Sequence, residues 1–317
     1  MKEKIVKLLN WMSADLIDKD DIIKISLLGI LSGENIILLG PPGTAKSRIA
    51  RKLSQIIDNN SYFEYLLTKY TTPEELFGPL SILKLKNDEF KRNVEGYLPV
   101  AKIAFLDEIF KANSSILNSL LTIINEKKYH NGKEEMDVPL VSLIGASNEF
   151  PKLEELKALY DRFLLKMEVT YVDNEERKKL FTLKDKEYPI PENLKLTFEE
   201  IKKIQDDSIN IILPSNIIKI IEKIIDYYEK SFDDKNKNIE KVSDRRIVKI
   251  SRLMRVSAYT NGRKKVDISD IFLLKYCLWN DPQNKEKLDL IMEKVIKEEM
   301  KNIFWGVNMN YESVTDK

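Results

Sequence analysis

The sequence predicts an α/β fold, in which a parallel sheet covered by helices on both faces (an αβα core) is followed by a smaller all-helical domain. Short apolar runs alternate with helix-like segments through the first half of the chain. After about Val172 the strand-like runs end and long helical periods replace them. We therefore expect a sheet domain at 1–173, a helical domain at 174–305 and a frayed tail at 306–317.

The strands expected of the sheet are apolar runs, most of which have turn or polar residues at their ends. They lie at 36–39, 63–67, 103–106, 140–146 and 164–169. Helix-like segments separate them at 45–57, 114–125 and 153–159. Because parallel strands need crossover connections, this alternation favours a parallel sheet.

The second half has the periodicity of amphipathic helices. Ile217, Ile220, Ile221 and Ile224 follow the i, i+3, i+4 rule, and comparable patterns continue to about Met300. This part of the chain is therefore expected to form a bundle of helices without strands.

Composition narrows the classes of function. Lys plus Arg number 52 and Asp plus Glu 51, so no overall basic field draws the chain to nucleic acid or to an anionic membrane. With one cysteine, Cys277, and one histidine, His130, neither an internal disulfide nor a zinc site of such ligands is expected. The N-terminus lacks the apolar core of a signal peptide, and no apolar stretch is long enough to span a bilayer. We expect a soluble cytoplasmic protein.

The strongest motif is GPPGTAKS, which comprises Gly40, Pro41, Pro42, Gly43, Thr44, Ala45, Lys46 and Ser47. It follows an apolar strand and opens a helix at Arg48, which is the context of a phosphate-binding P-loop. Loop N–H groups and the helix N-terminus would face the phosphates of ATP. Lys46 would reach the β- and γ-phosphates, and the Ser47 hydroxyl would ligate Mg²⁺. The whole loop and Arg48 are candidate nucleotide-binding residues.

One position departs from the P-loop consensus, because Ala45 replaces the glycine expected before the lysine. A methyl group is tolerated there if the backbone is already helical with negative φ. We therefore expect Ala45 to have a helical backbone.

A second motif is the apolar strand before Asp107 and Glu108. Adjacent carboxylates at the end of a buried strand need water, a metal or a cation as partner. Asp107 would position Mg²⁺, and Glu108 would be the base that polarises the attacking water. The alternative is an ordinary strand end with a helix-capping acid, which the preceding P-loop disfavours.

Three further polar residues complete the candidate site. Asn148 follows an apolar strand and would hold the attacking water or touch the γ-phosphate, although it could simply form a turn. Arg162 would act as an arginine finger in a neighbouring subunit, or else pair locally with Asp161. Arg245 or Arg246, in the first turn of a helix capped by Ser243 or Asp244, would face phosphate or make a salt bridge.

Taken together, the motifs resemble the MoxR family of AAA+ ATPases, and within it the RavA-like branch. The segments that carry the resemblance are GPPGTAKS, TTPEELFGPLSI, GYLP, FLDEIFKA, ILNSLLTIINE, GASNEFP, ALYDRF and SDRR, in that order. The resemblance as a whole runs from about Asp15 to about Arg263. RavA-like proteins also carry a long C-terminal extension. The sequence ends at Lys317 without it, so we carry nothing over from the extension.

The resemblance implies an AAA+ core with a helical lid and two insertions, at about 80–99 and 128–139. It implies homo-oligomeric rings, generally hexamers, with ATP at the subunit interfaces. It places Arg162 in trans and the other site residues, namely Lys46, Ser47, Asp107, Glu108, Asn148 and Arg245, in cis. Arg245 is chosen over Arg246 as sensor 2 by motif alignment. Thr68, at the end of the second strand, would restrain Glu108 until ATP is sensed.

The family's role implies ATP-driven remodelling or maturation of partner proteins, often ones with von Willebrand factor A domains. The alternative is a nucleic-acid-associated AAA+ motor or loader, which the lysine-rich segments could support. Acids are interleaved with those lysines and no groove-reading motif is present, so no sequence-specific nucleic acid is expected. A scaffold that binds nucleotide without turnover is disfavoured because Glu108 is present.

Overall fold

The chain is described by a computed structural model, which covers residues 1–58, 61–151, 153–183, 189–232 and 240–312. It divides into two compact units, Met1–Asp207 and Ser208–Lys317. Each unit is described by itself below.

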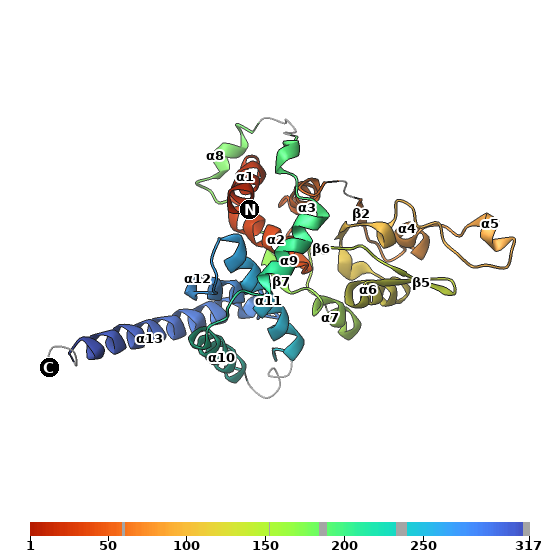
Figure 1. Cartoon of the computed structure of the whole chain (residues 1–317). Coiled ribbons are helices and arrows are strands. Elements are labelled where there is room, and N and C mark those ends of the chain that lie inside the picture. Colours follow the sequence, from red (N-terminus) through yellow and green to blue (C-terminus); the bar gives the residue numbers. More distant parts are fainter. Residues whose placement is uncertain (59–60, 152, 184–188, 233–239, 313–317) are drawn as a thin grey trace. The chain divides into compact units, whose positions relative to one another are not determined.

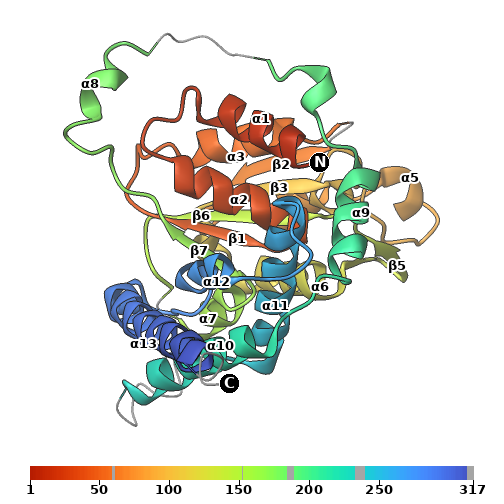
Figure 2. The same cartoon turned by 60° about the vertical axis from the view of Figure 1, so that its left-hand side comes forward.

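The first unit, whose elements are coloured red to green in Figure 1, is built on a five-stranded parallel sheet. The strand order of this sheet is β2-β3-β6-β1-β7 (Figure 2). Its strands are β1 (Ile36–Leu39), β2 (Tyr62–Leu66), β3 (Ile103–Asp107), β6 (Ser142–Ser147) and β7 (Leu165–Glu168). All five expected strands are present, and the α/β fold class is confirmed. β1, β3 and β6 are almost wholly buried, which explains why they read as continuous apolar runs rather than alternating ones.

Helices cover both faces of this sheet (Figure 2). The α-helices of the first unit are α1 (Lys2–Ser13), α2 (Asp20–Ser32), α3 (Lys46–Gln55), α4 (Pro73–Phe77), α5 (Ile82–Leu85), α6 (Ser114–Glu126), α7 (Glu154–Tyr160), α8 (Arg177–Leu180) and α9 (Phe198–Ser208). α2 and α3 lie on one face, and α6 and α7 on the other. This division follows from the right-handedness of crossover connections. α3 connects β1 to β2, towards one edge of the sheet, whereas α6 connects β3 to β6 and α7 connects β6 to β7, towards the other edge.

The two insertions expected from the family resemblance are present and contact each other. β4 (Lys128–Asn131) and β5 (Glu134–Asp137) form an antiparallel hairpin, and α5 lies in the other insertion. The backbone N–H of Arg92 donates to Asn131 Oδ1 at 2.7 Å. Lys91 Nζ lies 2.5 Å from Glu134 Oε1. These bonds tie the base of the first insertion to the hairpin.

The division between the units falls at Asp207, later than the change of pattern near 173 from which the sequence-based boundary was drawn. Side chains of α9 explain the difference. Lys4 Nζ lies 2.8 Å from Glu200 Oε2, and Gln205 Nε2 donates to the Leu31 carbonyl at 3.2 Å. α9 therefore packs on α1 and α2, although its own sequence is helical and continues the pattern of the second half.

In the described residues of the second unit, the regular elements are helices, joined by loops. Its α-helices are α10 (Ser215–Lys230), α11 (Asp244–Thr260), α12 (Ile268–Ile271) and α13 (Lys285–Glu312). α13 packs on α10, where Lys223 pairs with Glu298 and Glu299 at 2.9 Å. α13 continues through the region beyond Trp305, where the sequence predicted fraying. In the parts of the chain described here, no helix has the length and apolarity needed to cross a membrane.

Candidate nucleotide-binding site

The carboxyl ends of β1, β3 and β6 lie side by side at one edge of the sheet, and the predicted site forms there. A pocket of about 270 Å³ is lined by residues of the P-loop and of these strand ends. They are Pro42, Gly43, Thr44, Ala45, Lys46, Ser47, Arg48, Asp107, Glu108 and Asn148. The sheet order explains the convergence, because β6 separates β1 from β3 and all three run parallel.

The two glycines of the P-loop are required by its backbone path. Gly40 has φ +155°, and a Cβ there would lie 2.1 Å from the Val169 carbonyl oxygen. Gly43 has φ +77° with open space around it, so the constraint there is conformational. The loop thus turns tightly between β1 and α3.

The expectation for Ala45 is wrong. Its φ is +70° and its ψ +20°, in the left-handed region, at the N-cap position of α3. The loop requires this conformation to turn into α3, whatever residue stands there. An L-residue with a Cβ pays about 1–2 kcal/mol in this region, which glycine avoids.

Lys46 is buried and bridges the P-loop to β6. Its Nζ donates to the carbonyls of Gly40 and Pro41 at 2.7 and 2.8 Å, and to Asn148 Oδ1 at 2.8 Å. Burial lowers the pKa of Lys46, and the charges of Asp107 and Glu108 oppose this shift. The ammonium therefore stands at the floor of the pocket with carboxylates beside it.

Ser47 and Asp107 form the part of the pocket suited to a metal. Ser47 Oγ lies 3.5 Å from Asp107 Oδ2. Mg²⁺ prefers oxygen ligands and usually takes only one or two from the protein, the rest coming from phosphates and water. This donor pair beside the P-loop fits that requirement.

Both carboxylate oxygens of Glu108 are engaged. Asn148 Nδ2 donates to Oε1 at 2.5 Å, and Lys111 Nζ lies 3.5 Å from Oε2. The structure therefore brings Glu108 and Asn148 into direct contact, and adds Lys111, which the sequence reasoning missed. The Thr68 hydroxyl instead meets Thr71 Oγ1 at 3.1 Å and accepts from the N–H of Tyr70. Among the described residues, no hydrogen bond joins the Thr68 side chain to Glu108.

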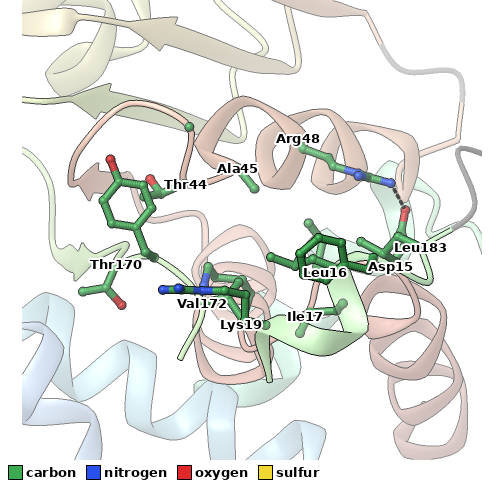
Figure 3. A pocket seen from close by; sticks show the side chains of 15 residues that line it. Asp15, Leu16, Ile17, Lys19, Thr44, Ala45, Arg48, Thr170, Val172 and Leu183 are labelled. Atoms are coloured by element: carbon green, nitrogen blue, oxygen red, sulfur yellow. Dashed lines mark hydrogen bonds and ion pairs between the residues drawn. The ribbon is translucent and has the colours of Figure 1, made fainter. Parts of the chain in front are cut away.

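A second, larger pocket of about 600 Å³ shares Gly43, Thr44, Ala45 and Arg48 with the first (Figure 3). Its other walls come from 15–19, 170–172 and 177–183, and they are mainly apolar. An apolar slot beside a phosphate loop is suited to the flat base of a nucleotide. The sequence reasoning missed these residues, because three distant segments form the slot and none carries a motif.

Arg48 does not point at the phosphate loop. Its Nη2 lies 2.9 Å from Oδ2 of the buried Asp15, as Figure 3 shows. Lys52, one turn later on α3, also pairs with Asp15. Its Nζ lies 4.6 Å from the Trp11 ring centroid. These contacts fix α3, and hence the P-loop, against the segment that follows α1.

Arg162 lies apart from the residues of this pocket, and the arginines of the second unit are described within that unit. Arg162 precedes β7, and its carbonyl accepts from Asn35 Nδ2 at 3.4 Å, at the amino end of β1. Its Nη1 lies 3.1 Å from Asp161 Oδ2, the local pair considered above. In the second unit, Ser243 caps α11, Arg245 is exposed and Arg246 is buried.

The fold and the site together define a P-loop NTPase of the AAA+ class: a parallel αβα core with its phosphate loop, acid pair and strand-end asparagine, followed by helices. Residues 3–206 match the family described as the MoxR domain in the MoxR-vWA-beta-propeller ternary systems, and residues 216–292 match an AAA lid domain. The chain belongs to the MoxR family of AAA+ ATPases.

Individual relatives agree with this assignment. An uncharacterized protein of Methanocaldococcus jannaschii is 42% identical over 318 residues, covering 100% of this chain and 80% of its own length. Chaperone MoxR1 of Mycobacterium tuberculosis is 24% identical over 52% of this chain and 44% of its own. A crystal structure from Cytophaga hutchinsonii, of a protein to which ATPase activity is ascribed, has a TM-score of 0.72. It shares 18% identity and covers 93% of this chain and 94% of its own, which supports the fold.

Proposed function

We propose that this chain binds ATP with Mg²⁺ and hydrolyses its β–γ phosphoanhydride bond. The observation that carries the proposal is the hydrogen-bonded series Lys46–Asn148–Glu108 at the mouth of the P-loop. It sets a phosphate-binding cation, a polar amide and a carboxylate base next to one another in one pocket. Phosphoryl transfer needs this positioning and charge placement more than covalent chemistry.

Each side chain has a defined task in this proposal. Lys46 contacts the β- and γ-phosphates, Asn148 orients the attacking water, and Glu108 accepts its proton. Ser47 and Asp107 hold Mg²⁺, which when bound neutralises phosphate charge. The apolar slot beside the loop takes the adenine base.

Arg162 acts in a neighbouring subunit, in a ring of identical chains that we take to be a hexamer. Its place at the amino end of the sheet supports this, because β1 alone spans ~13 Å between that edge and the P-loop. Within the described residues, Arg162 Nε is buried and has no hydrogen-bond partner. Buried groups without a partner are rare in native proteins, so we expect this side chain to change its contacts when the ring assembles.

Arg245 is the better candidate for the lid arginine that senses nucleotide. Arg246 is buried, and its Nη1 donates to the Leu278 carbonyl at 3.2 Å, which gives it a structural role in the second unit. Arg245 is exposed in the same helical turn.

ATP turnover then drives remodelling or maturation of a partner protein with a von Willebrand factor A domain. The family description names such domains, and the relative in M. tuberculosis is named a chaperone. Membership of the RavA-like branch stays a prediction. So does the absence of sequence-specific nucleic-acid binding.

The direct test is Mg²⁺-dependent ATP hydrolysis by the wild-type chain and by Glu108→Gln. We expect turnover in the wild type, and in the variant retained ATP binding with turnover lost by ~10²-fold or more. An unchanged rate in Glu108→Gln would refute the assignment of the base. Parallel assays add duplex DNA or a candidate partner domain at moderate salt. Strong stimulation by DNA would favour a nucleic-acid motor instead.

A further inference from the structure

An aromatic cluster of Phe110, Phe150 and Tyr160 lies beside the candidate site. The ring centroids of Phe150 and Tyr160 are 5.2 Å apart with an interplanar angle of 77°. Those of Phe110 and Tyr160 are 5.9 Å apart at 64°. Both are edge-to-face contacts, the geometry that aromatic pairs prefer and that holds rings at a defined angle. Tyr160 is therefore the central member of the cluster.

Each ring of the cluster stands two residues from a residue of the proposed mechanism. Phe110 follows Glu108, Phe150 follows Asn148, and Tyr160 precedes Arg162. Glu108 and Asn148 are themselves joined by the 2.5 Å hydrogen bond. A shift of either residue when nucleotide binds would thus displace a ring that packs on Tyr160.

Tyr160 is also fixed to the sheet. It is 3% exposed, and Lys166 Nζ lies 4.5 Å from its ring centroid. Lys166 is fully buried in β7, where it is the register partner of Ile37 in β1. A desolvated cation is attracted to the face of a tyrosine ring, so the ring has a preferred position against the strands.

We infer that Tyr160 is a positioning residue that sets Arg162 according to the state of its own subunit's site. Nucleotide at the P-loop draws Lys46 and Asn148 towards phosphate, and the rings on the strand ends move with them. Tyr160, at the end of α7, conveys the shift to Arg162 two residues later, which serves the neighbouring site. The inference rests on the proposed role of Arg162 in trans. It adds a connection between adjacent sites through packed side chains.

Two variants at this position separate the ring from the hydroxyl. Tyr160→Phe keeps the ring contacts and should retain wild-type turnover. Tyr160→Leu should lose ~10- to 100-fold in kcat, the size expected when a catalytic group is misplaced by about 1 Å. Its Kd for ATP should stay within about 3-fold of wild type, since no P-loop contact is changed. Phe163→Leu is the control, because Phe163 is equally buried and follows Arg162 but has no ring contact with the cluster among the described pairs.

Mixed assemblies decide where the defect of Tyr160→Leu lies. Its own sites are intact, so adding Glu108→Gln subunits, which supply a correctly placed Arg162, should restore turnover per Tyr160→Leu subunit. Mixing Arg162→Ala subunits with Glu108→Gln subunits tests the proposed function itself, namely that Arg162 acts in a neighbouring subunit. If Arg162→Ala is rescued and Tyr160→Leu is not, Tyr160 acts within its own site and the inference is wrong. If neither variant is rescued, Arg162 does not act in trans, and the inference about Tyr160 fails with that role.

Lys166→Met is a second route to the same answer if Tyr160→Leu does not fold. Methionine keeps most of the buried volume but removes the cation over the ring. We expect a smaller loss of kcat that Glu108→Gln subunits also rescue. A loss of kcat without rescue, or wild-type turnover in this variant, would count against the inference.

Discussion

Asn148 joins Lys46 to Glu108 through the two ends of its side-chain amide. Its Oδ1 accepts from Lys46 Nζ at 2.8 Å, and its Nδ2 donates to Glu108 Oε1 at 2.5 Å. Only this orientation of the amide satisfies both neighbours, because an ammonium can only donate and a carboxylate can only accept. Asn148 therefore contacts both the proposed phosphate-binding cation and the proposed base.

Replacing Asn148 with aspartate tests this double role. Asn148→Asp keeps the shape and the bond to Lys46, but it loses the donor to Glu108 and places a second negative charge beside it. We expect kcat to fall by ~10²-fold, the usual cost of removing one preorganised donor, with a smaller loss of ATP affinity because the added negative charge faces the phosphates. Steady-state hydrolysis and equilibrium binding of labelled ATP would measure this. Equal losses in kcat and affinity would show that Asn148 merely supports the loop.

Arg162→Ala tests the shared site. An arginine finger contributes 10³- to 10⁵-fold to kcat, so the variant alone should be nearly inactive while still binding ATP. Mixed with Glu108→Gln subunits, which hold an intact Arg162, it should recover turnover. Sedimentation of each preparation would show that both variants assemble. Absence of recovery at every mixing ratio in assembled rings would place Arg162 in its own subunit.

The sequence predicted the parts of the site that one short segment encodes. The P-loop, the acid pair and Asn148 each follow a buried strand, and parallel strand ends converge, so these side chains were expected to lie together, as they do. The larger, mainly apolar pocket was missed because Asp15, Tyr171 and Phe181 meet only through the fold. The unit boundary was missed because α9 is helical whichever unit it packs against.

Ala45 shows a different limit of prediction from sequence, because the identity of a residue does not give the backbone dihedral angles of its loop. The observed φ of +70° predicts that Ala45→Gly stabilises the first unit. Relief of strain of about 1–2 kcal/mol exceeds the entropic cost of glycine, about 0.5–1 kcal/mol. We expect Tm to rise by ~2 °C. Thermal unfolding followed by circular dichroism would measure it, with Ala50→Gly inside α3 as a control that should lower Tm. A fall in Tm for Ala45→Gly would refute the strained loop.

The contact between the two insertions predicts a pH dependence. The hydrogen bond from Lys91 holds the pKa of Glu134 below its ordinary value. The pair therefore stabilises the fold above the ordinary glutamate pKa, and this contribution is lost as pH falls through the lower, folded pKa. Carboxyl NMR titration should show the pKa of Glu134 rising in Lys91→Met and unchanged in Lys128→Met. An identical titration in all three chains would exclude the pair in solution.

Replacing Glu240 is expected to lower the free energy of unfolding strongly, because this carboxylate organises several groups of the second unit. It is 2% exposed and accepts hydrogen bonds from Tyr228 Oη at 2.8 Å and from the backbone N–H groups of Asn280 and Asp281 at 2.9 Å. Asn284 Nδ2 adds a fourth at 2.9 Å. Glu240→Ala leaves these donors buried without an acceptor, so we expect a loss of about 3–5 kcal/mol in the free energy of unfolding.

Glu240→Gln should fall between the wild type and Glu240→Ala, because its oxygen still accepts two of the bonds while its NH₂ group faces donors. Tyr228→Phe removes one bond and should cost about 1 kcal/mol. Chemical denaturation of the full chain would rank these variants, with the exposed Glu222→Ala on α10 as the matched control. If Glu240→Ala and Glu222→Ala had the same effect, the buried carboxylate would not organise the second unit.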